Sequence, residues 1–381
     1  MKRFLALLLT ILCLTLPVRA VDVLPADAIS VAAPSACLME RSTGTVLYEK
    51  DAHTPRPIAS VTKVMTLLLV LEAVDRGEIA LTDTVTASSH AAGMGGSQIW
   101  LEEGEQMTVD EMLKCVTVVS ANDCATALAE FVAGTEESFV QKMNERAAAL
   151  GMTDTHFVDC TGLTDDPNHH ACAYDVAVMS RELLSHDQIR TYSTIWMDTA
   201  RDGAFGLTNT NKLIRFYEGA TGLKTGYTSA AKYCLAASAL RSGTEYVAVV
   251  LGADSSADRF ESAKTLLNYA FANYVLRPMR METPLPPIPV TLGAADCVQP
   301  VYPDLPGTVL TKQQAGDLQF DLQLPDRLEA PIAAGESIGT LTVSSGGQTL
   351  AEIPLLADRE IPRLNTGKIF AKLVEILFCA P

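Results

Sequence analysis

Basic residues are scarce in this chain of 381 residues. Its 29 lysines and arginines face 45 aspartates and glutamates, and the formal net charge is −16. Proteins that hold nucleic acid neutralise its phosphates with a basic surface, so we expect no nucleic-acid partner. The same acidity repels an anionic lipid surface, so any membrane contact must come from a local apolar or basic patch.

Other features are missing too. The nine cysteines include no C-x-x-C pair, and no internal repeat or low-complexity tract is present. The cysteine spacing therefore matches neither a zinc knuckle nor a small disulfide scaffold. We expect most cysteines to be free, buried thiols, and we expect neither a metal nor an organic cofactor.

The N-terminus has the pattern of an export signal. Lys2 and Arg3 precede an apolar segment at 4–16, and Val18-Arg19-Ala20 supplies small residues for cleavage. The apolar segment is too short to remain as a membrane span, which needs about 20 residues. Residues 1–20 are thus predicted to be a signal peptide, and the mature protein is predicted to work outside the cytoplasm. The residues after the signal peptide are more than a single hydrophobic core usually holds, which suggests two domains.

Periodicity and turn residues predict the order of elements. A strand pair is followed by several helices, then by another strand pair and a long helix. This order indicates an α+β sheet with helices on both faces. The expected strands are 37–40, 45–48, 233–240 and 246–252, and the expected helices are 58–73, 108–118, 123–133, 136–150, 174–185 and a helix through 260–274.

The proline-rich stretch 284–289 is the expected domain boundary, because such a sequence forms a stiff linker. It separates residues 21–282 from a β-rich domain at 283–361. The tail at 362–381 is predicted to be an amphipathic helix. It is too short to span a bilayer and suits a position in the membrane interface.

The segment Ser60-Val61-Thr62-Lys63 lies at the start of the predicted helix 58–73. Residues three apart on a helix share a face, so the amine of Lys63 can reach the hydroxyl of Ser60. A serine is a poor nucleophile until a base takes its proton. A lysine can be that base when burial and cationic neighbours lower its pKa. Alone, this motif is weak evidence for catalysis, because a serine that caps a helix and a lysine on the surface produce the same sequence pattern.

Two more short motifs follow. Ser120-Ala121-Asn122 lies between two predicted helices, and Lys224-Thr225-Gly226 opens a predicted strand. Singly, each has a structural explanation, such as a helix cap. Together they reproduce the S-x-x-K, S-x-N and K-T-G order that is typical of penicillin-recognising serine enzymes.

With these motifs and the segments 45–50, 59–66 and 222–228, the chain resembles the D-Ala-D-Ala carboxypeptidases of the low-molecular-mass penicillin-binding protein family. The resemblance implies a β-lactamase/DD-peptidase-like catalytic domain, with an antiparallel sheet and a helical subdomain. A small all-β domain and a C-terminal amphipathic helix would follow. It also implies a protein attached peripherally to the extracytoplasmic face of the membrane.

The same resemblance implies roles for the first two motifs. Ser60 would be the nucleophile, and Lys63 would be its general base. Ser120 and Asn122 would relay protons and hold the substrate amide. The backbone N–H groups of Ser60 and Tyr227 would form the oxyanion hole.

Substrate binding would fall to the third motif and one distant residue. Lys224 and Thr225 would bind the terminal carboxylate, beside Gly226 and Tyr227. Arg259 matches a family arginine that helps hold that carboxylate, although a solvated arginine at a helix start is the alternative. The implied partners are peptidoglycan stem peptides that end in D-Ala-D-Ala, and β-lactams as covalent inhibitors.

The sequence departs from the family pattern at two positions and leaves two other functions open. Ala121 stands where the family usually has glycine, and Lys232 stands where many relatives have glycine.

A class A-like β-lactamase is one alternative function, but its Glu-x-x-Leu-Asn segment is absent; residues 182–185 lack the asparagine. A non-catalytic penicillin sensor is the other, although a receptor has no need of a proton relay.

Overall fold

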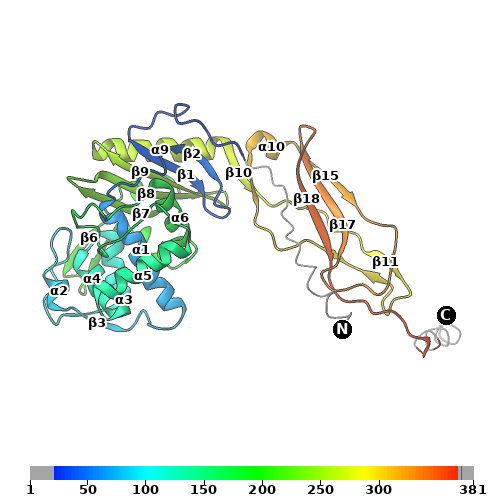
Figure 1. The fold of residues 1–381 in the computed structure, drawn as a ribbon, viewed down its shortest axis with the longest axis horizontal. Helices are drawn as coiled ribbons and strands as arrows, with labels where there is room; N and C mark the ends of the chain where they lie inside the picture. Colours follow the sequence, from blue (N-terminus) through cyan, green and yellow to red (C-terminus); the bar gives the residue numbers. More distant parts are fainter. Residues whose placement is uncertain (1–20, 368–369, 371–381) are drawn as a thin grey trace. The chain divides into compact units, whose positions relative to one another are not determined.

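The computed structural model describes residues 21–367 and Phe370 (Figure 1). By their contacts, these residues form two compact units, one over Val21–Tyr274 and one from Val275 onward. The division falls ahead of the proline-rich stretch. The predicted signal peptide and most of the predicted C-terminal helix lie outside the described residues. Within the part described, no helix is long and apolar enough to cross a membrane.

A five-stranded antiparallel sheet forms the centre of the first unit. A two-residue turn at Ser242 and Gly243, with φ of 50° and 79°, connects two of its long strands. Positive φ at both positions matches the twist of a tight hairpin. In spatial order, the strands are β2 (Val46–Lys50), β1 (Ser35–Glu40), β9 (Thr244–Ala253), β8 (Lys232–Arg241) and β7 (Ala220–Thr228).

Helices cover both faces of this sheet, as predicted. Helix α9 (Ser256–Asn273) packs on β8 and β9, and the Ser255 hydroxyl caps it by accepting from the N–H of Asp258. On the other face, α6 (Ala173–Leu183) packs on β1 and β9 (Figure 1). Both faces of the sheet are therefore protected from water, which accounts for the nearly continuous apolar runs of its central strands.

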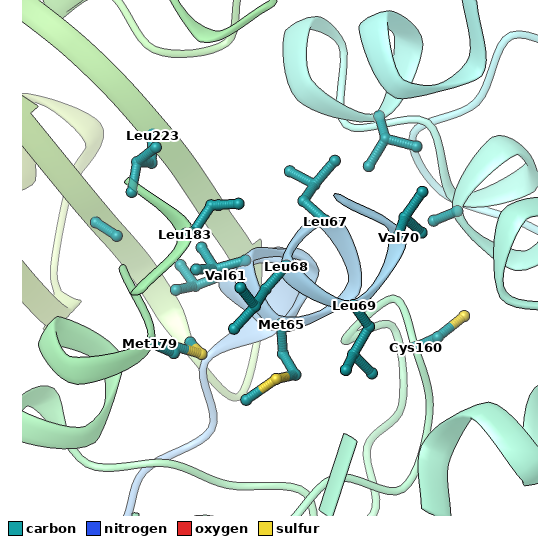
Figure 2. Close-up of a cluster of buried hydrophobic side chains, with 14 of the residues drawn as sticks. Val61, Met65, Leu67, Leu68, Leu69, Val70, Cys160, Met179, Leu183 and Leu223 are labelled. Carbon is teal, nitrogen blue, oxygen red and sulfur yellow. The ribbon is translucent and has the colours of Figure 1, made fainter. Parts of the chain in front are cut away.

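The buried helix α1 (Lys63–Asp75) is the centre of the helical subdomain. Ten of its 13 residues are buried, as expected of a helix that is apolar on every side. Figure 2 shows Met65, Leu67 and Leu68 pointing outward from α1 in different directions into the apolar core. The surrounding helices include α3 (Val109–Val118), α4 (Asn122–Ala133), α5 (Glu136–Ala149) and α6.

Smaller elements complete the first unit. A single 3₁₀ turn, η1 (Ala59–Thr62), leads directly into α1. The others are β3 (Thr84–Thr86), α2 (Ser89–Ala92), β4 (Gln106–Thr108), α7 (Ile189–Ser193), β5 (Met197–Ala200), β6 (Phe205–Thr208) and α8 (Leu213–Phe216).

The second unit is built from short strands, as the alternating sequence predicted. Apolar residues such as Leu341, Leu355 and Ile288 fill its two small cores. One sheet contains β12 (Cys297–Val298), β11 (Ile288–Thr291) and β16 (Leu328–Glu329), and another contains β13 (Pro300–Val301), β18 (Gln348–Ala357), β17 (Ser337–Ser345) and β15 (Leu318–Gln323). The remaining elements are β10 (Tyr274–Arg277), β14 (Thr308–Thr311) and α10 (Lys312–Gly316).

The cysteines behave as expected in the part of the chain that is described. All seven are free, and six of them are buried; Cys297 alone is exposed. A buried free cysteine acts as a small hydrophobic residue.

Candidate active site

The first motif occupies the junction of η1 and α1. The Nζ atom of Lys63 donates to the hydroxyl of Ser60 at 2.9 Å and to the carbonyl of Thr161 at 2.8 Å. The sequence predicted one continuous α-helix here, whereas the structure has a 3₁₀ turn before α1. Side chains three apart eclipse each other in a 3₁₀ turn, and this brings the two groups into contact.

The amine of Lys63 is completely buried. Burial lowers its pKa from 10.5 to about 7, against the opposing effect of Cys160, Asp159 and Asp123. Near neutral pH, a substantial fraction of this amine is therefore uncharged. An uncharged amine in contact with a hydroxyl can accept its proton, which is the condition for activating the serine.

The loop that holds Lys63 from the other side was not predicted from the sequence. The carboxylate of Asp159 accepts from the backbone N–H groups of Thr161, Gly162 and Thr164. These bonds fix the Thr161 carbonyl that Lys63 contacts. Gly162 has a φ of +75°, and a Cβ there would lie 1.9 Å from the carbonyl oxygen of Ala59. The Asp-x-x-Gly spacing of this turn is the signal that could have identified it.

His169 supports the same turn in one defined tautomer. The N–H of Val158 donates to its Nδ1 at 3.1 Å, so Nδ1 carries the lone pair. Its Nε2–H then donates to the hydroxyl of Thr62 at 2.7 Å. Burial lowers the pKa of His169 and favours this neutral form. The imidazole thus holds the residue immediately before Lys63.

The second motif lies at the break between α3 and α4. Asn122 donates from Nδ2 to the carbonyl of Gly95 at 2.7 Å, while its backbone N–H donates to Ser97 at 2.7 Å. The hydroxyl of Ser120 and the Oδ1 of Asn122 are buried without a hydrogen-bond partner. Most buried polar atoms are paired, so two unpaired atoms on one motif are what a ligand-binding site presents.

The third motif lies on β7, the edge strand of the sheet. Lys224 is buried and donates to the carbonyl of Thr225 at 3.1 Å, and the Thr225 hydroxyl donates to that of Thr210 at 2.8 Å. A Cβ on Gly226 would lie 2.6 Å from the carbonyl oxygen of Ile58. Glycine is therefore what lets this strand approach the turn that carries the serine.

Tyr227, the last residue in the predicted set on this strand, is 57% exposed. Its ring lies against that of Tyr233, with 4.5 Å between the centroids.

Arg259 reaches the third motif from α9. Its Nη1 donates to the carbonyl of Gly226 at 3.0 Å and to that of Cys234 at 3.3 Å, and its side chain is buried. It is therefore not a solvated arginine at a helix start. Its Nε atom is buried without a partner.

Lys63, Lys224 and Arg259 lie close enough together for their charged forms to repel one another. Burial lowers the pKa of Lys224 well below its usual range, and the charges of Lys63 and Arg259 lower it further. Mutual repulsion of this kind is relieved by an anion. In a protein with a net charge of −16, such a site suits an anionic group such as a carboxylate.

The two departures from the family pattern have clear positions. Ala121 is completely buried just before α4. Lys232 has a φ of 55°, a left-handed conformation that glycine adopts without strain. Its amine contacts Asp254 at 2.5 Å at the exposed end of β8.

Comparison with known proteins adds to this geometry. The sequence profile of the D-alanyl-D-alanine carboxypeptidase family matches residues 22–255, and that of the C-terminal domain of penicillin-binding protein 5 matches residues 290–363. The D-alanyl-D-alanine carboxypeptidase DacF of Bacillus subtilis is 42% identical over 87% of this chain and 86% of its own length.

Two solved structures are also similar. Penicillin-binding protein 5 of Haemophilus influenzae has a TM-score of 0.73 and 27% identity, over 88% of this chain and 98% of its own. Penicillin-binding protein D2 of Listeria monocytogenes, in its ampicillin-bound form, has a TM-score of 0.58 and 31% identity. That match covers 63% of this chain and 98% of the other.

Proposed function

Because this chain belongs to the D-alanyl-D-alanine carboxypeptidase family, we propose that it removes the terminal D-alanine from peptidoglycan stem peptides that end in D-Ala-D-Ala. The observation that carries the proposal is the contact between the buried Lys63 amine and the Ser60 hydroxyl. The function is that of a serine peptidase working through an acyl-enzyme.

In the acylation step, Lys63 takes the proton of Ser60 as the serine oxygen attacks the carbonyl carbon of the penultimate D-alanine. The peptide C–N bond then breaks, and the terminal D-alanine leaves as an amine that has received a proton through Ser120. In the second step, Lys63 takes a proton from water as the water oxygen attacks the ester carbon. Lys63 then gives this proton to the Ser60 oxygen as the ester C–O bond breaks, which releases the shortened peptide and restores Ser60. Asn122 holds the substrate amide, and the N–H groups of Ser60 and Tyr227 stabilise the oxyanion.

The terminal carboxylate of the substrate binds Lys224 and Thr225, with Arg259 close by. The proximity of Lys224 and Arg259 supports the assignment, because a bound carboxylate favours the charged forms of both side chains. A β-lactam also carries a carboxylate near its reactive carbonyl. We therefore propose that β-lactams enter the same site and acylate Ser60.

The requirement for a free carboxylate gives a direct test. Purified protein is expected to release D-alanine from a peptide ending in D-Ala-D-Ala, and to cleave the corresponding C-terminal amide at least about tenfold more slowly, since charge-assisted hydrogen bonds contribute about 1.5–3 kcal/mol. D-Alanine release measured by chromatography distinguishes the two substrates.

The same protein is also incubated with penicillin. Three outcomes of these two experiments would contradict parts of the proposal. Equal rates on acid and amide would show that carboxylate recognition is wrongly assigned. Acylation by penicillin without peptide turnover would indicate a sensor. Rapid release of hydrolysed penicillin without peptide turnover would indicate a β-lactamase.

We also propose that the protein is exported and attached to the outer face of the cell membrane through residues 362–381. Apolar residues surround a polar stripe of Lys368, Lys372 and Glu375 when this segment is drawn as a helix. The rest of the chain is acidic and is not expected to adhere to anionic lipid by itself. Packing of this segment on the protein's own β-rich unit is the alternative.

A chain that ends at Pro362 is expected to keep peptidase activity but to lose binding to vesicles that contain anionic lipid. Co-sedimentation of the mature full-length and shortened chains measures this. The attachment proposal is wrong if the shortened chain still sediments with the vesicles, or if the longer one does not.

A further inference from the structure

Three side chains with metal-binding atoms meet away from the residues assigned to catalysis. One ligand atom each from His53, Asp154 and Cys172 lies within 4.8 Å of the other two. His53 belongs to the connection between β2 and η1, and Asp154 belongs to the connection between α5 and α6. Cys172 is the residue that caps α6. Three separate segments thus supply one potential ligand each.

Backbone hydrogen bonds tie these segments together. Arg56 and Ala171 exchange two hydrogen bonds, both of 3.0 Å, and the N–H of Tyr174 donates to Ala52 at 3.0 Å. The N–H of Asp154 donates to the carboxylate of Asp175 at 3.0 Å. The main chain beside each ligand is therefore fixed before any ion binds. Binding then costs less conformational entropy, because these segments need not be ordered first.

The donor set indicates the class of metal. A thiolate, an imidazole and a carboxylate are all ligands of Zn²⁺, which in open sites takes three protein ligands and one water. Ca²⁺ and Mg²⁺ prefer oxygen ligands throughout. The sulfur of Cys172 therefore favours zinc or a similarly thiophilic divalent ion over the hard cations.

The surroundings suit a bound cation as well. The carboxylate of Glu49 lies 3.2 Å from the Nε2 of His53, an arrangement that is common around metal-binding histidines. The N–H of Asp175 donates to the sulfur of Cys172 at 3.3 Å, at the N-terminus of the 11-residue helix α6. That bond orients the sulfur. Burial raises the pKa of its thiol to about 12, so an ion must displace the thiol proton in order to bind.

The spacing requires only a small closure. With zinc–ligand distances of about 2.0–2.3 Å, ligand atoms around a tetrahedral ion lie about 3.3–3.8 Å apart. The present 4.8 Å limit exceeds this range by about 1.0–1.5 Å. The side chain of His53 is 58% exposed, so it has room to rotate inward.

We propose that His53, Asp154 and Cys172 form a Zn²⁺ site that joins the segment before the nucleophile turn to the start of α6. The site contains none of the residues assigned to catalysis, and the proposal does not rest on the proposed peptidase function. Zinc bound there stabilises the folded state, because the three ligands converge only after folding.

Cobalt titration of the full chain tests this site. Protein stripped of metal with a chelator and kept reduced by a phosphine is titrated with Co²⁺, followed by Zn²⁺. We expect the near-ultraviolet charge-transfer absorption of a cobalt–thiolate bond, lost when one equivalent of Zn²⁺ is added. Cys172→Ser should remove the band and weaken Zn²⁺ binding at least tenfold, yet keep an oxygen that can cap α6.

Two further variants complete the design. His53→Gln should retain the cobalt–thiolate band but weaken Zn²⁺ binding at least tenfold. Cys297→Ser, which removes the exposed thiol of the second unit, should change neither. Penicillin labelling of each variant reports independently on the fold and the catalytic site. A band that survives Cys172→Ser, a band that disappears with Cys297→Ser, or no band at all would overturn the proposal.

Discussion

Replacement of Ser60 by alanine is expected to abolish covalent labelling by penicillin and to lower peptide turnover by on the order of 10⁴-fold or more, as loss of a nucleophile does in other serine hydrolases. The lysine then has no hydroxyl to deprotonate. The fold should survive. The Ser60 hydroxyl caps neither η1 nor α1, and its hydrogen bond with Lys63 is worth about 1 kcal/mol.

Mass spectrometry of the intact protein and of its proteolytic peptides measures the result. Wild-type protein should gain the full mass of one penicillin, on the peptide that contains Ser60. Ser229→Ala is a matched control, because Ser229 is exposed just beyond β7, and it should be labelled like the wild type. Labelling of Ser60→Ala at the wild-type rate would remove Ser60 from the mechanism.

Much of the fold could be predicted because the local signals agree with the long-range packing. The apolar segment 58–73 contains no polar face, so it had to be buried, and it became the centre of the helical subdomain. The expected strands 233–240 and 246–252 are present as β8 and β9, and the turn between them has positive φ at Ser242 and Gly243. The contact between Ser60 and Lys63 followed from a spacing of three residues, which brings side chains together in both α and 3₁₀ turns.

The supports of the site could not be predicted in this way, because their partners are remote in the sequence. The carbonyl of Thr161 contacts Lys63 across 98 positions, and His169 contacts Thr62 across 107. No periodicity encodes such pairs. The need for glycine at Gly226 likewise depends on how closely β7 approaches the carbonyl of Ile58, which only the assembled structure reveals.

The pH dependence of acylation should report the pKa of Lys63. Its amine can act as a base only when it is neutral, and burial lowers its pKa to about 7. The rate of acylation by penicillin is therefore expected to rise between pH 6 and 8, with a midpoint near 7, and to level off above it. Lys63→Met should lower the rate by about 10²- to 10⁴-fold, the usual contribution of a general base, and remove this rise. Stopped-flow measurement of labelling gives both results.

The same lysine should also make stability depend on pH in a predictable direction. Its pKa is lower in the folded state than the usual 10.5, so between about pH 7 and 10.5 the unfolded chain binds more protons than the folded one. The free energy of unfolding contributed by this group therefore rises with pH across that window, by up to about 1.4 kcal/mol per pH unit. Denaturant unfolding should show wild-type protein gaining stability relative to Lys63→Met from pH 7 to pH 9.

Lys142→Met, at an exposed position of α5, is the control for both experiments and should keep the rate profile and the stability trend of the wild type. A wild-type rate that is constant from pH 6 to 8, or a wild-type protein that loses stability relative to Lys63→Met as the pH rises, would show that Lys63 is not the buried base of this site.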